Sequence, residues 1–167
     1  MNFQCGDRVV YGIHGVCRIT DVEHRRVDHK TVEYYVLMPC CQGDARYYVP
    51  VHNQAAVAKM RPLLTAQQLS DLLASDEVQK DFWITEDHIR KERYRTLISQ
   101  GACAELVGMI RTLHLQKQRQ LEAGRKFHIC DENFLKDAKR LLCAETAEIL
   151  QMTHQQAEEY LRSQLEK

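Results

Sequence analysis

The sequence has little of what marks secreted, membrane-spanning or metal-binding proteins. Its 167 residues contain no apolar run long enough for a signal peptide or a membrane span, so we expect a cytoplasmic protein without membrane contact. The seven cysteines are an odd number and form no CxxC pair, which favours reduced thiols over a disulfide framework or a zinc site. We therefore expect neither a metal ion nor a cofactor.

Enzyme signatures are missing as well. Cysteine, histidine and aspartate residues are present, but no nucleophile motif or metal motif frames them. Gly12 and Gly15 lack the lysine and the serine or threonine that a phosphate-binding loop needs. The sequence thus predicts a protein that is not an enzyme and has no small-molecule substrate.

Net charge is also absent, because 23 Lys and Arg residues balance 23 Asp and Glu residues. The balance conceals a segregation along the chain. Residues 90–140 hold twelve basic and six acidic side chains, whereas residues 63–89 hold one basic and six acidic side chains. Such segregation allows one surface to attract a polyanion although the whole molecule is neutral.

The first part of the chain has the pattern of short strands. β-Branched and aromatic residues alternate with turn-forming segments such as Gln42-Gly43-Asp44. Five such strands within about sixty residues predict a small curled sheet or barrel, which hides its core and limits its open edges. The predicted strands are residues 8–11, 16–19, 32–37, 47–51 and 56–60.

A helical period begins at about residue 65. Thr65 and Thr153 each open an S/T-x-x-E/Q capping box, in which a side chain and the backbone bind each other's free N–H groups at a helix start. Gly101 and Gly124 fall where helices end. These signals divide the second part of the chain into several helices.

Apolar residues recur at helical spacing over residues 106–113 and 134–149. Both segments predict amphipathic helices, the second with Asp131 as a candidate N-cap. The sequence therefore predicts an α+β fold of two domains, a five-stranded β-barrel over residues 1–62 and an all-α domain of about five helices over residues 63–167.

Four motifs in the first domain occur in the order and spacing of a known family. They are Phe3-x-x-Gly6-Asp7-x-Val9-Val10-Tyr11-Gly12-x-x-Gly15-Val16, Glu33-Tyr34-Tyr35-Val36-Leu37, Val49-Pro50-Val51-x-Asn53 and Met60-Arg61-Pro62. In these motifs the domain resembles the RNA-polymerase-interaction domain of CarD/CdnL transcription regulators, a Tudor-like barrel that is also found in the transcription-repair coupling factor. The second domain is similar to these regulators in its tryptophan, its basic run and its segment 131–142, and the chain most resembles the CarD-like proteins of Firmicutes.

The resemblance implies a division of labour between the domains. The barrel would lay a strand edge against the β subunit of RNA polymerase, and the helical domain would grip promoter DNA just upstream of the melted bubble. Such a regulator changes transcription by binding one state of the polymerase–promoter complex more tightly than another, which alters open-complex stability.

Four residues are candidates for the polymerase contact. Arg25 coincides with a family arginine that contacts polymerase, and Val27 would share its face if the strand reaches that far. A second family arginine is replaced by Tyr48, while Arg46 could project from the same face. Arg25 could instead be an ordinary surface charge, and the tyrosines at positions 34, 35, 47 and 48 could pack together or form an aromatic cage.

Trp83 matches the DNA-wedging tryptophan of the family, which would stabilise a distorted base step, although a single tryptophan could also serve core packing. Phe82 could be the residue that packs while Trp83 points outward. The basic side chains nearby would neutralise phosphates without reading sequence, or they could simply be solvated helix faces. These candidates are Arg90, Lys91, Arg93, Arg95, Lys126, Lys136, Lys139 and Arg140.

An alternative function is a protein–protein adaptor that uses the barrel alone and does not bind DNA. This alternative gains weight if Trp83 and the basic run are buried, or if they pair with the acidic stretch around Asp76, Asp81 and Asp87. The position of these side chains in the fold therefore bears on the choice between the two functions.

Overall fold

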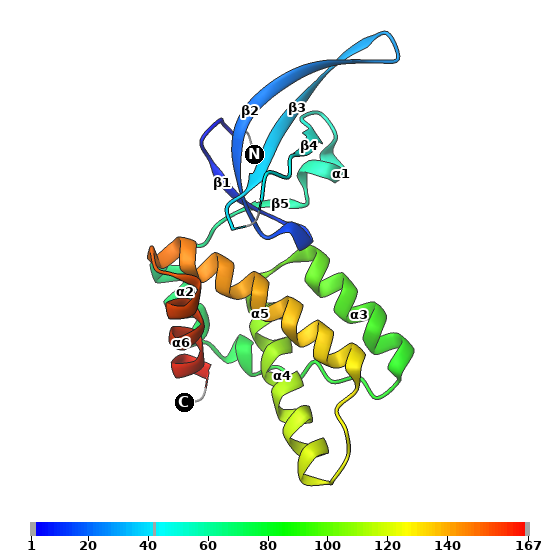
Figure 1. Cartoon of the computed structure of the whole chain (residues 1–167), viewed down its shortest axis with the longest axis vertical. Coiled ribbons are helices and arrows are strands. Elements are labelled where there is room, and N and C mark those ends of the chain that lie inside the picture. The colour runs from blue at the N-terminus through cyan, green and yellow to red at the C-terminus, as the bar shows by residue number, and fades with distance from the viewer. Residues whose placement is uncertain (1–2, 42, 166–167) are drawn as a thin grey trace. The chain divides into compact units, whose positions relative to one another are not determined.

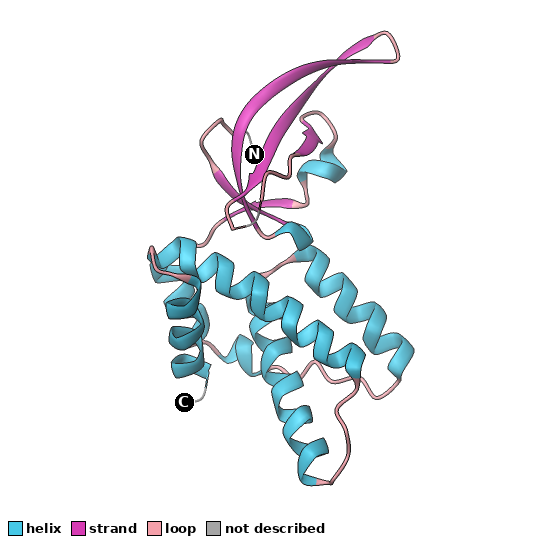
Figure 2. Cartoon of the chain, in the orientation of Figure 1, coloured by secondary structure: helices cyan, strands magenta, loops and turns pink. Residues whose placement is uncertain are grey.

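The chain forms two compact units, residues 1–63 and 64–167, in a computed structural model that describes residues 3–41 and 43–165 (Figure 1). The first unit is built mainly from strands and the second from helices (Figure 2). The predicted α+β layout, with a β part followed by a helical part, is confirmed. Among the described residues, no helix has both the length and the apolar character needed to cross a membrane.

The first unit is an antiparallel sheet with the strand order β4-β3-β2-β1-β5. Its strands are rich in β-branched and aromatic residues, which favour extended backbone, and several of these, among them Val9, Tyr35 and Val49, are buried. Its elements are β1 (Arg8–Tyr11), the 3-10 helix η1 (Gly12–His14), β2 (Val16–Val27), β3 (Lys30–Pro39), β4 (Tyr47–Pro50), α1 (Gln54–Val57) and β5 (Met60–Pro62).

The sheet covers a small apolar core but remains open. Five strands are present as predicted, yet the two edge strands β4 and β5 do not pair with each other in the described part of the chain. The predicted closed barrel is therefore an open sheet, and helix α1 adds apolar side chains to its core where a closing strand pair would have been expected. The buried core consists of Val9, Cys17, Ile19, Tyr35, Leu37, Val49 and Met60.

β2 and β3 form a long hairpin that extends beyond the other strands of the unit (Figure 1). They pair from Cys17 opposite Pro39 to Val27 opposite Lys30. The two-residue turn between them, residues 28–29, has φ values of 47° and 65°. Positive φ at both positions is the mark of a type I′ turn, whose twist matches that of the flanking strands.

The hairpin is longer than the sequence predicted, because residues 20–27, most of them polar, continue the strand that was expected to end at residue 19. A β-bulge between Ile19 and Asp21 marks the point where the pattern changes. A bulge inserts one residue and bends the strand, so the alternation of buried and exposed residues is broken there. Because of that break, the sequence pattern did not indicate that the strand continues to Val27.

Residues 54–62 contain a short helix and a short strand, whereas the sequence predicted a strand over residues 56–60. Asn53 accepts a hydrogen bond from the backbone N–H of Ala56 (3.1 Å), so it caps α1 and turns the chain into a helix. The fifth strand begins only at Met60, and the predicted position was wrong for that reason. Gln42, part of a predicted turn, lies outside the described residues.

The second unit contains both predicted capping boxes. Gln68 donates its N–H to Thr65 Oγ1 (3.1 Å), and Thr65 donates its N–H to Gln68 Oε1 (2.9 Å). Thr153 and Gln156 exchange the same two bonds, at 3.2 and 2.9 Å. The elements of the described part of this unit are α2 (Ala66–Leu73), the 3-10 helix η2 (Asp76–Gln79), α3 (Asp87–Gln100), α4 (Cys103–Glu122), α5 (Ile129–Leu150) and α6 (His154–Leu165).

Helix ends agree with the sequence in two places and differ in one. Gly101 caps α3 in the left-handed conformation (φ 64°), and Gly124 (φ 70°) follows the end of α4. The N-cap of α5 is His128, however, so Asp131 lies in the first turn of that helix. The prediction of Asp131 as the N-cap was wrong because its carboxylate binds Arg90 instead.

The apolar stripes predicted for α4 and α5 are buried in one core. These two helices pack against each other, and α6 packs against α5. From α4 the core takes Leu106, Val107, Ile110 and Leu113, and from α5 it takes Leu135, Ala138, Leu141 and Leu142.

Gly108 of α4 allows the segment before α3 to pack closely on this core. A Cβ atom at position 108 would overlap the ring carbons of Phe82. Phe82 also donates its backbone N–H to Thr112 Oγ1 (3.0 Å), one turn further along α4. The missing side chain of Gly108 thus fixes where Phe82, and with it the following residue Trp83, can lie.

We predict that Gly108→Ala lowers the free energy of unfolding by about 1–3 kcal/mol, because the Phe82 ring must move out of a packed position. Helix propensity alone predicts the opposite sign, a gain of about 1 kcal/mol for alanine over glycine. Urea denaturation measures the difference. The double variant Gly108→Ala/Phe82→Leu should lose less than the two single changes together, and a stabilised Gly108→Ala variant would contradict the prediction.

Candidate functional site

The first candidate surface, here called the hairpin surface, consists of Arg25 and Val27 on β2 and Tyr48 on β4. The Arg25 guanidinium lies over the Tyr48 ring, with 3.6 Å between Cζ and the ring centroid. Its Nε and Nη2 also donate to Glu23 Oε2, at 3.0 and 2.9 Å. Alternate residues of a strand share a face, and Val27 is 43% exposed, so the surface offers a cation and an apolar side chain together.

The sequence places Val27 on the same face as Arg25 only if the strand extends that far, and β2 does extend to Val27. Arg46, the fourth predicted residue, is exposed two positions before Tyr48 and precedes β4. Arg25 therefore contacts Tyr48 directly, whereas Arg46 lies in the loop immediately before β4.

The tyrosines considered for an aromatic cage lie in different surroundings. Tyr35 is buried in the sheet core, and Tyr47 packs on His14 with 3.9 Å between the ring centroids. Arg25 already covers the ring of Tyr48. These three side chains therefore do not line one open ring.

The hairpin also offers a backbone edge. β3 pairs with β2 along its length, but β1 pairs with β2 only from Val16 to Arg18. Within the described chain, residues 21–27 of β2 thus have a strand partner on one side only. An unpaired edge of this kind can accept a strand from another protein.

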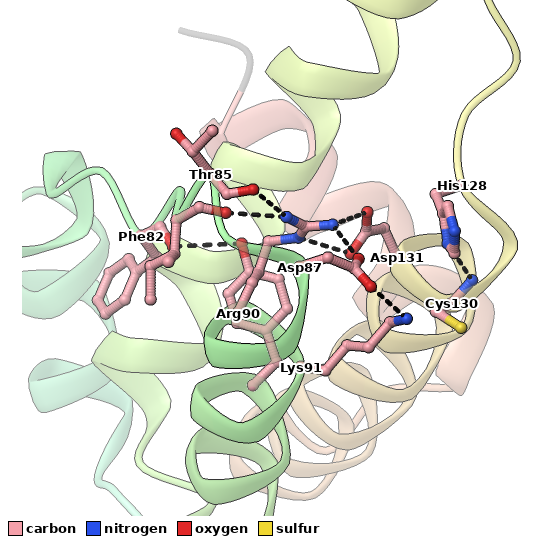
Figure 3. Close-up of polar contacts among 10 residues, drawn as sticks. Phe82, Thr85, Asp87, Arg90, Lys91, His128, Cys130 and Asp131 are labelled. Carbon is pink, nitrogen blue, oxygen red and sulfur yellow. Dashed lines mark hydrogen bonds and ion pairs between the residues drawn. The ribbon is translucent and has the colours of Figure 1, made fainter.

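The second candidate region is the set of polar contacts around Arg90 (Figure 3). This arginine is only 5% exposed. Its Nε and Nη2 donate to the two carboxylate oxygens of Asp131 on α5, at 3.1 and 3.0 Å. Nη2 also donates to Asp87 Oδ1 (2.8 Å). Nη1 donates to the backbone carbonyls of Ile84 (2.9 Å) and Thr85 (3.4 Å), so five bonds match the five N–H donors of a guanidinium.

Trp83 lies next to this arginine. The Arg90 Cζ is 4.4 Å from the Trp83 ring centroid, which is cation–π distance, and the indole is partly buried against the helical core. The backbone N–H of Trp83 donates to Asp81 Oδ1 (2.9 Å). One face of the ring is therefore occupied within the protein.

Tyr94 of α3 also binds the segment that carries Trp83. Its hydroxyl donates to the carbonyl oxygen of Phe82 (3.2 Å), and its ring packs edge-on to Phe134. Burial raises the pKa of the Tyr94 hydroxyl, which keeps this group a donor at all physiological pH values. The segment 81–85 is thus bound to α3 through Arg90 and Tyr94 and to α4 through Thr112.

An exposed ion pair continues the network outward. Lys91 Nζ lies 2.6 Å from Asp87 Oδ2, and this bond raises the pKa of Lys91 and lowers the pKa of Asp87. Burial alone would lower the pKa of Arg90, but the hydrogen bonds and charge of Asp131 raise it overall. Both cations therefore stay charged with their acids.

The predicted basic run 90–95 does not form one continuous cationic face. Arg90 is buried, so in this structure it does not belong to an exposed phosphate-binding set, and Asp131 is the physical reason. Lys91 is paired with Asp87, and Arg93 lies 4.0 Å from Glu105. Arg95 is exposed on the outer side of α3.

The other predicted cations lie on or before α5. Lys136 is exposed, Lys139 and Arg140 are half-buried, and Lys126 is exposed in the segment between α4 and α5. Positions 136, 139 and 140 are three and four residues apart, so they share one helix face.

Lys117 of α4 was not predicted as a site residue, but it borders this face. Its Nζ lies 2.8 Å from Glu132 Oε2. The hydrogen bond from Lys117 lowers the pKa of Glu132, and the positive charges of Lys136 and Lys139 lower it further. Asp131 was also missed as a partner of Arg90, because the two are 41 residues apart and no sequence signal links them.

No cluster of three or more histidine, cysteine, aspartate or glutamate side chains in the described ranges could hold a metal ion. The arrangement around Arg90 consists of complete ion pairs and hydrogen bonds. What it offers is a fixed position for the segment that carries Trp83.

Comparison with known proteins concerns the first unit. Residues 3–64 match the family model described as the CarD-like/TRCF RID domain, in agreement with the four sequence motifs. No curated protein matches the chain. The match indicates a transcription-related protein that interacts with RNA polymerase, and it does not single out the Firmicutes type.

We predict that Arg90→Met lowers the free energy of unfolding by about 3–5 kcal/mol, because it leaves the buried carboxylate of Asp131 without its partner. The emission of Trp83, the only tryptophan, should shift to the red as its covered face opens. Chemical denaturation followed by tryptophan fluorescence measures both effects.

The matched control is Arg95→Met, an exposed change on the same helix, which should alter stability by less than about 0.5 kcal/mol. The double variant Arg90→Met/Asp131→Leu should recover much of the loss, since neither charge then remains buried. Equal losses for Arg90→Met and Arg95→Met would show that the network is unimportant.

Proposed function

We propose that this protein is a cytoplasmic, non-enzymatic transcription regulator of the CarD type, most similar to the Firmicutes kind, that binds the RNA polymerase β subunit and upstream promoter DNA. The match of residues 3–64 to the CarD-like/TRCF RID domain is the observation that carries the proposal. By holding polymerase and DNA at once, the regulator would change the stability of the open complex.

The polymerase contact would use the hairpin surface and the backbone edge beside it. Arg25 is held against Tyr48 and Glu23, so little side-chain freedom is lost when it meets a partner. The unpaired edge of β2 can supply main-chain hydrogen bonds, while Val27 supplies an apolar contact. The Tudor-like barrel of the family would then be represented here by an open, curled sheet.

The DNA contact would use basic residues of the helical unit other than Arg90, which is buried against Asp131. Lys136, Lys139 and Arg140 share a face of α5, Lys126 is exposed in the segment before that helix, and Arg95 is exposed on α3. Such side chains bind phosphates through counterion release, which gives salt-sensitive and largely sequence-independent affinity. Trp83 would contribute a ring edge at a distorted base step, because one of its faces is covered by Arg90.

Binding alone is sufficient for such a regulator. If polymerase and DNA surfaces are both present only in one state of the initiation complex, a protein that contacts both stabilises that state by its differential affinity. No turnover is required, and no cofactor, metal ion or small substrate enters the proposal.

A second function is favoured by the ion pairs of α3. Arg90 and Lys91 bind Asp87, Arg93 lies near Glu105, and Trp83 is partly buried, which are the features expected of a protein–protein adaptor that does not bind DNA. In this case the helical unit would be a scaffold, and only the sheet unit would bind polymerase.

We predict that Arg25→Ala weakens binding of the full chain to the polymerase β subunit by about tenfold, as expected for a centrally placed arginine at an interface. Arg26→Ala is the matched control, because neighbouring residues of a strand point to opposite faces. Biolayer interferometry with immobilised β subunit measures both affinities. Equal affinities for the two variants would remove the hairpin surface from the proposal.

We predict that Lys136→Gln reduces the slope of log K against log salt by about 0.9 for a duplex with a melted bubble, the value for one lost phosphate contact. Lys80→Gln, an exposed change in the acidic segment 63–89, should leave the slope unchanged. Fluorescence anisotropy across a salt series measures the slopes. Absence of DNA binding at low salt would favour the adaptor and end the DNA half of the proposal.

A further inference from the structure

A groove of about 650 Å³ lies in the helical unit, and its lining includes neither Arg90 nor any residue of the hairpin surface. One side is formed by α4, where Ile110, His114, Lys117 and Leu121 recur at intervals of three or four residues and so share a helix face. The other side is formed by α6, with Leu161 and Leu165, and α5 contributes to the lining between them. The lining of the groove thus comes from the three helices α4, α5 and α6, which are labelled in Figure 1.

The groove exposes apolar surface that the helical core does not use. Leu115 and Leu121 line it and are 51% and 59% exposed. Leu161, by contrast, is only 4% exposed and belongs to the core. The apolar lining therefore continues outward from the core to the surface of the unit.

The charges around the groove are mainly positive. Arg111, Lys117, Lys139 and Arg162 line it, against the single carboxylate of Glu158. Lys117 is bonded to Glu132, which lies outside the groove lining. An apolar lining with a cationic rim is complementary to a ligand with an apolar stripe and acidic flanks.

We propose that this groove docks an acidic amphipathic helix of a partner protein. The α4 stripe from Ile110 to Leu121 spans about 16 Å at 1.5 Å per residue, which matches three turns of a guest helix. Helices that lie in apolar grooves present anchors at i, i+3 or i+4, and i+7, and acidic flanks would meet the cationic rim. The guest would complete the packing of α4, α5 and α6.

Other occupants fit the lining less well. Duplex DNA would contact the cations but would gain nothing from Leu115 and Leu121, because phosphates do not bind leucine. A single acyl chain could fill part of the space, but it would leave exposed leucines along α4 in water. The docking proposal uses no residue of the hairpin surface, so its success or failure is independent of polymerase binding.

The test uses the full chain and a designed, fluorescently labelled peptide of about 18 residues, long enough to be partly helical alone, with a leucine stripe and glutamate flanks. A counterpart carries lysine in place of glutamate. We expect the acidic peptide to bind at least about tenfold more tightly than the basic one in fluorescence anisotropy, with charge complementarity as the cause.

Leu115→Asp should weaken binding of the acidic peptide by about tenfold, through lost apolar contact and added negative charge. Ile129→Asp is the matched control, because Ile129 is 73% exposed and does not line the groove. Arg162→Glu should also weaken binding, while Lys80→Glu should not. Circular dichroism melting of each variant checks that it folds, and these exposed positions leave the core intact.

Results of three kinds would overturn the proposal. The first is equal binding of the acidic and basic peptides, or equal binding by the Leu115→Asp and Ile129→Asp variants. The second is displacement of the acidic peptide by dodecanoate, which would assign the groove to an acyl chain. The third is self-association of the chain, measured by analytical ultracentrifugation, that Leu115→Asp abolishes, which would assign the groove to a second copy.

Discussion

The helical unit depends on one buried cation, Arg90, whose five donors reach α5, the start of α3 and the segment that carries Trp83. Desolvating a guanidinium and a carboxylate is expensive, so the pair with Asp131 is weak support for overall stability. Its effect is geometric. A guanidinium has fixed donor directions, and only one placement of these three chain segments satisfies all of them. The position of Trp83 follows from that placement.

The same chemistry divides the cations of the unit into two groups. Arg90 and Lys91 form ion pairs with carboxylates at the start of α5 and α3, which largely neutralise their charge within the protein. Lys136, Lys139 and Arg140 lie further along α5, where Lys136 is exposed and the other two are half-buried. A polyanion and an acidic helix would both be drawn to the latter side. Lys139, which lines the groove, is where these two kinds of partner would compete.

The sheet unit has its own constraint, the length of the β2–β3 hairpin. A two-residue turn with positive φ and a bulge hold the strands in a twisted ladder well beyond the core. Beyond Arg18 this ladder has no further strand on the β1 side among the described residues. Exposed edges invite pairing with other chains. Charged residues along this edge limit unspecific pairing.

The sequence by itself determined the features that rest on local chemistry. The change from strand to helix period, both capping boxes and the Gly101 helix end depend on residues within four positions of each other, and the family motifs of the first unit are likewise contiguous. Only the tertiary structure decided that Arg90 is buried, that the sheet stays open and that Leu115 lines a groove. Each of these depends on residues far apart in the chain, such as Arg90 and Asp131, 41 positions apart. From the sequence alone, a basic residue that pairs with a distant carboxylate cannot be distinguished from one that binds a phosphate.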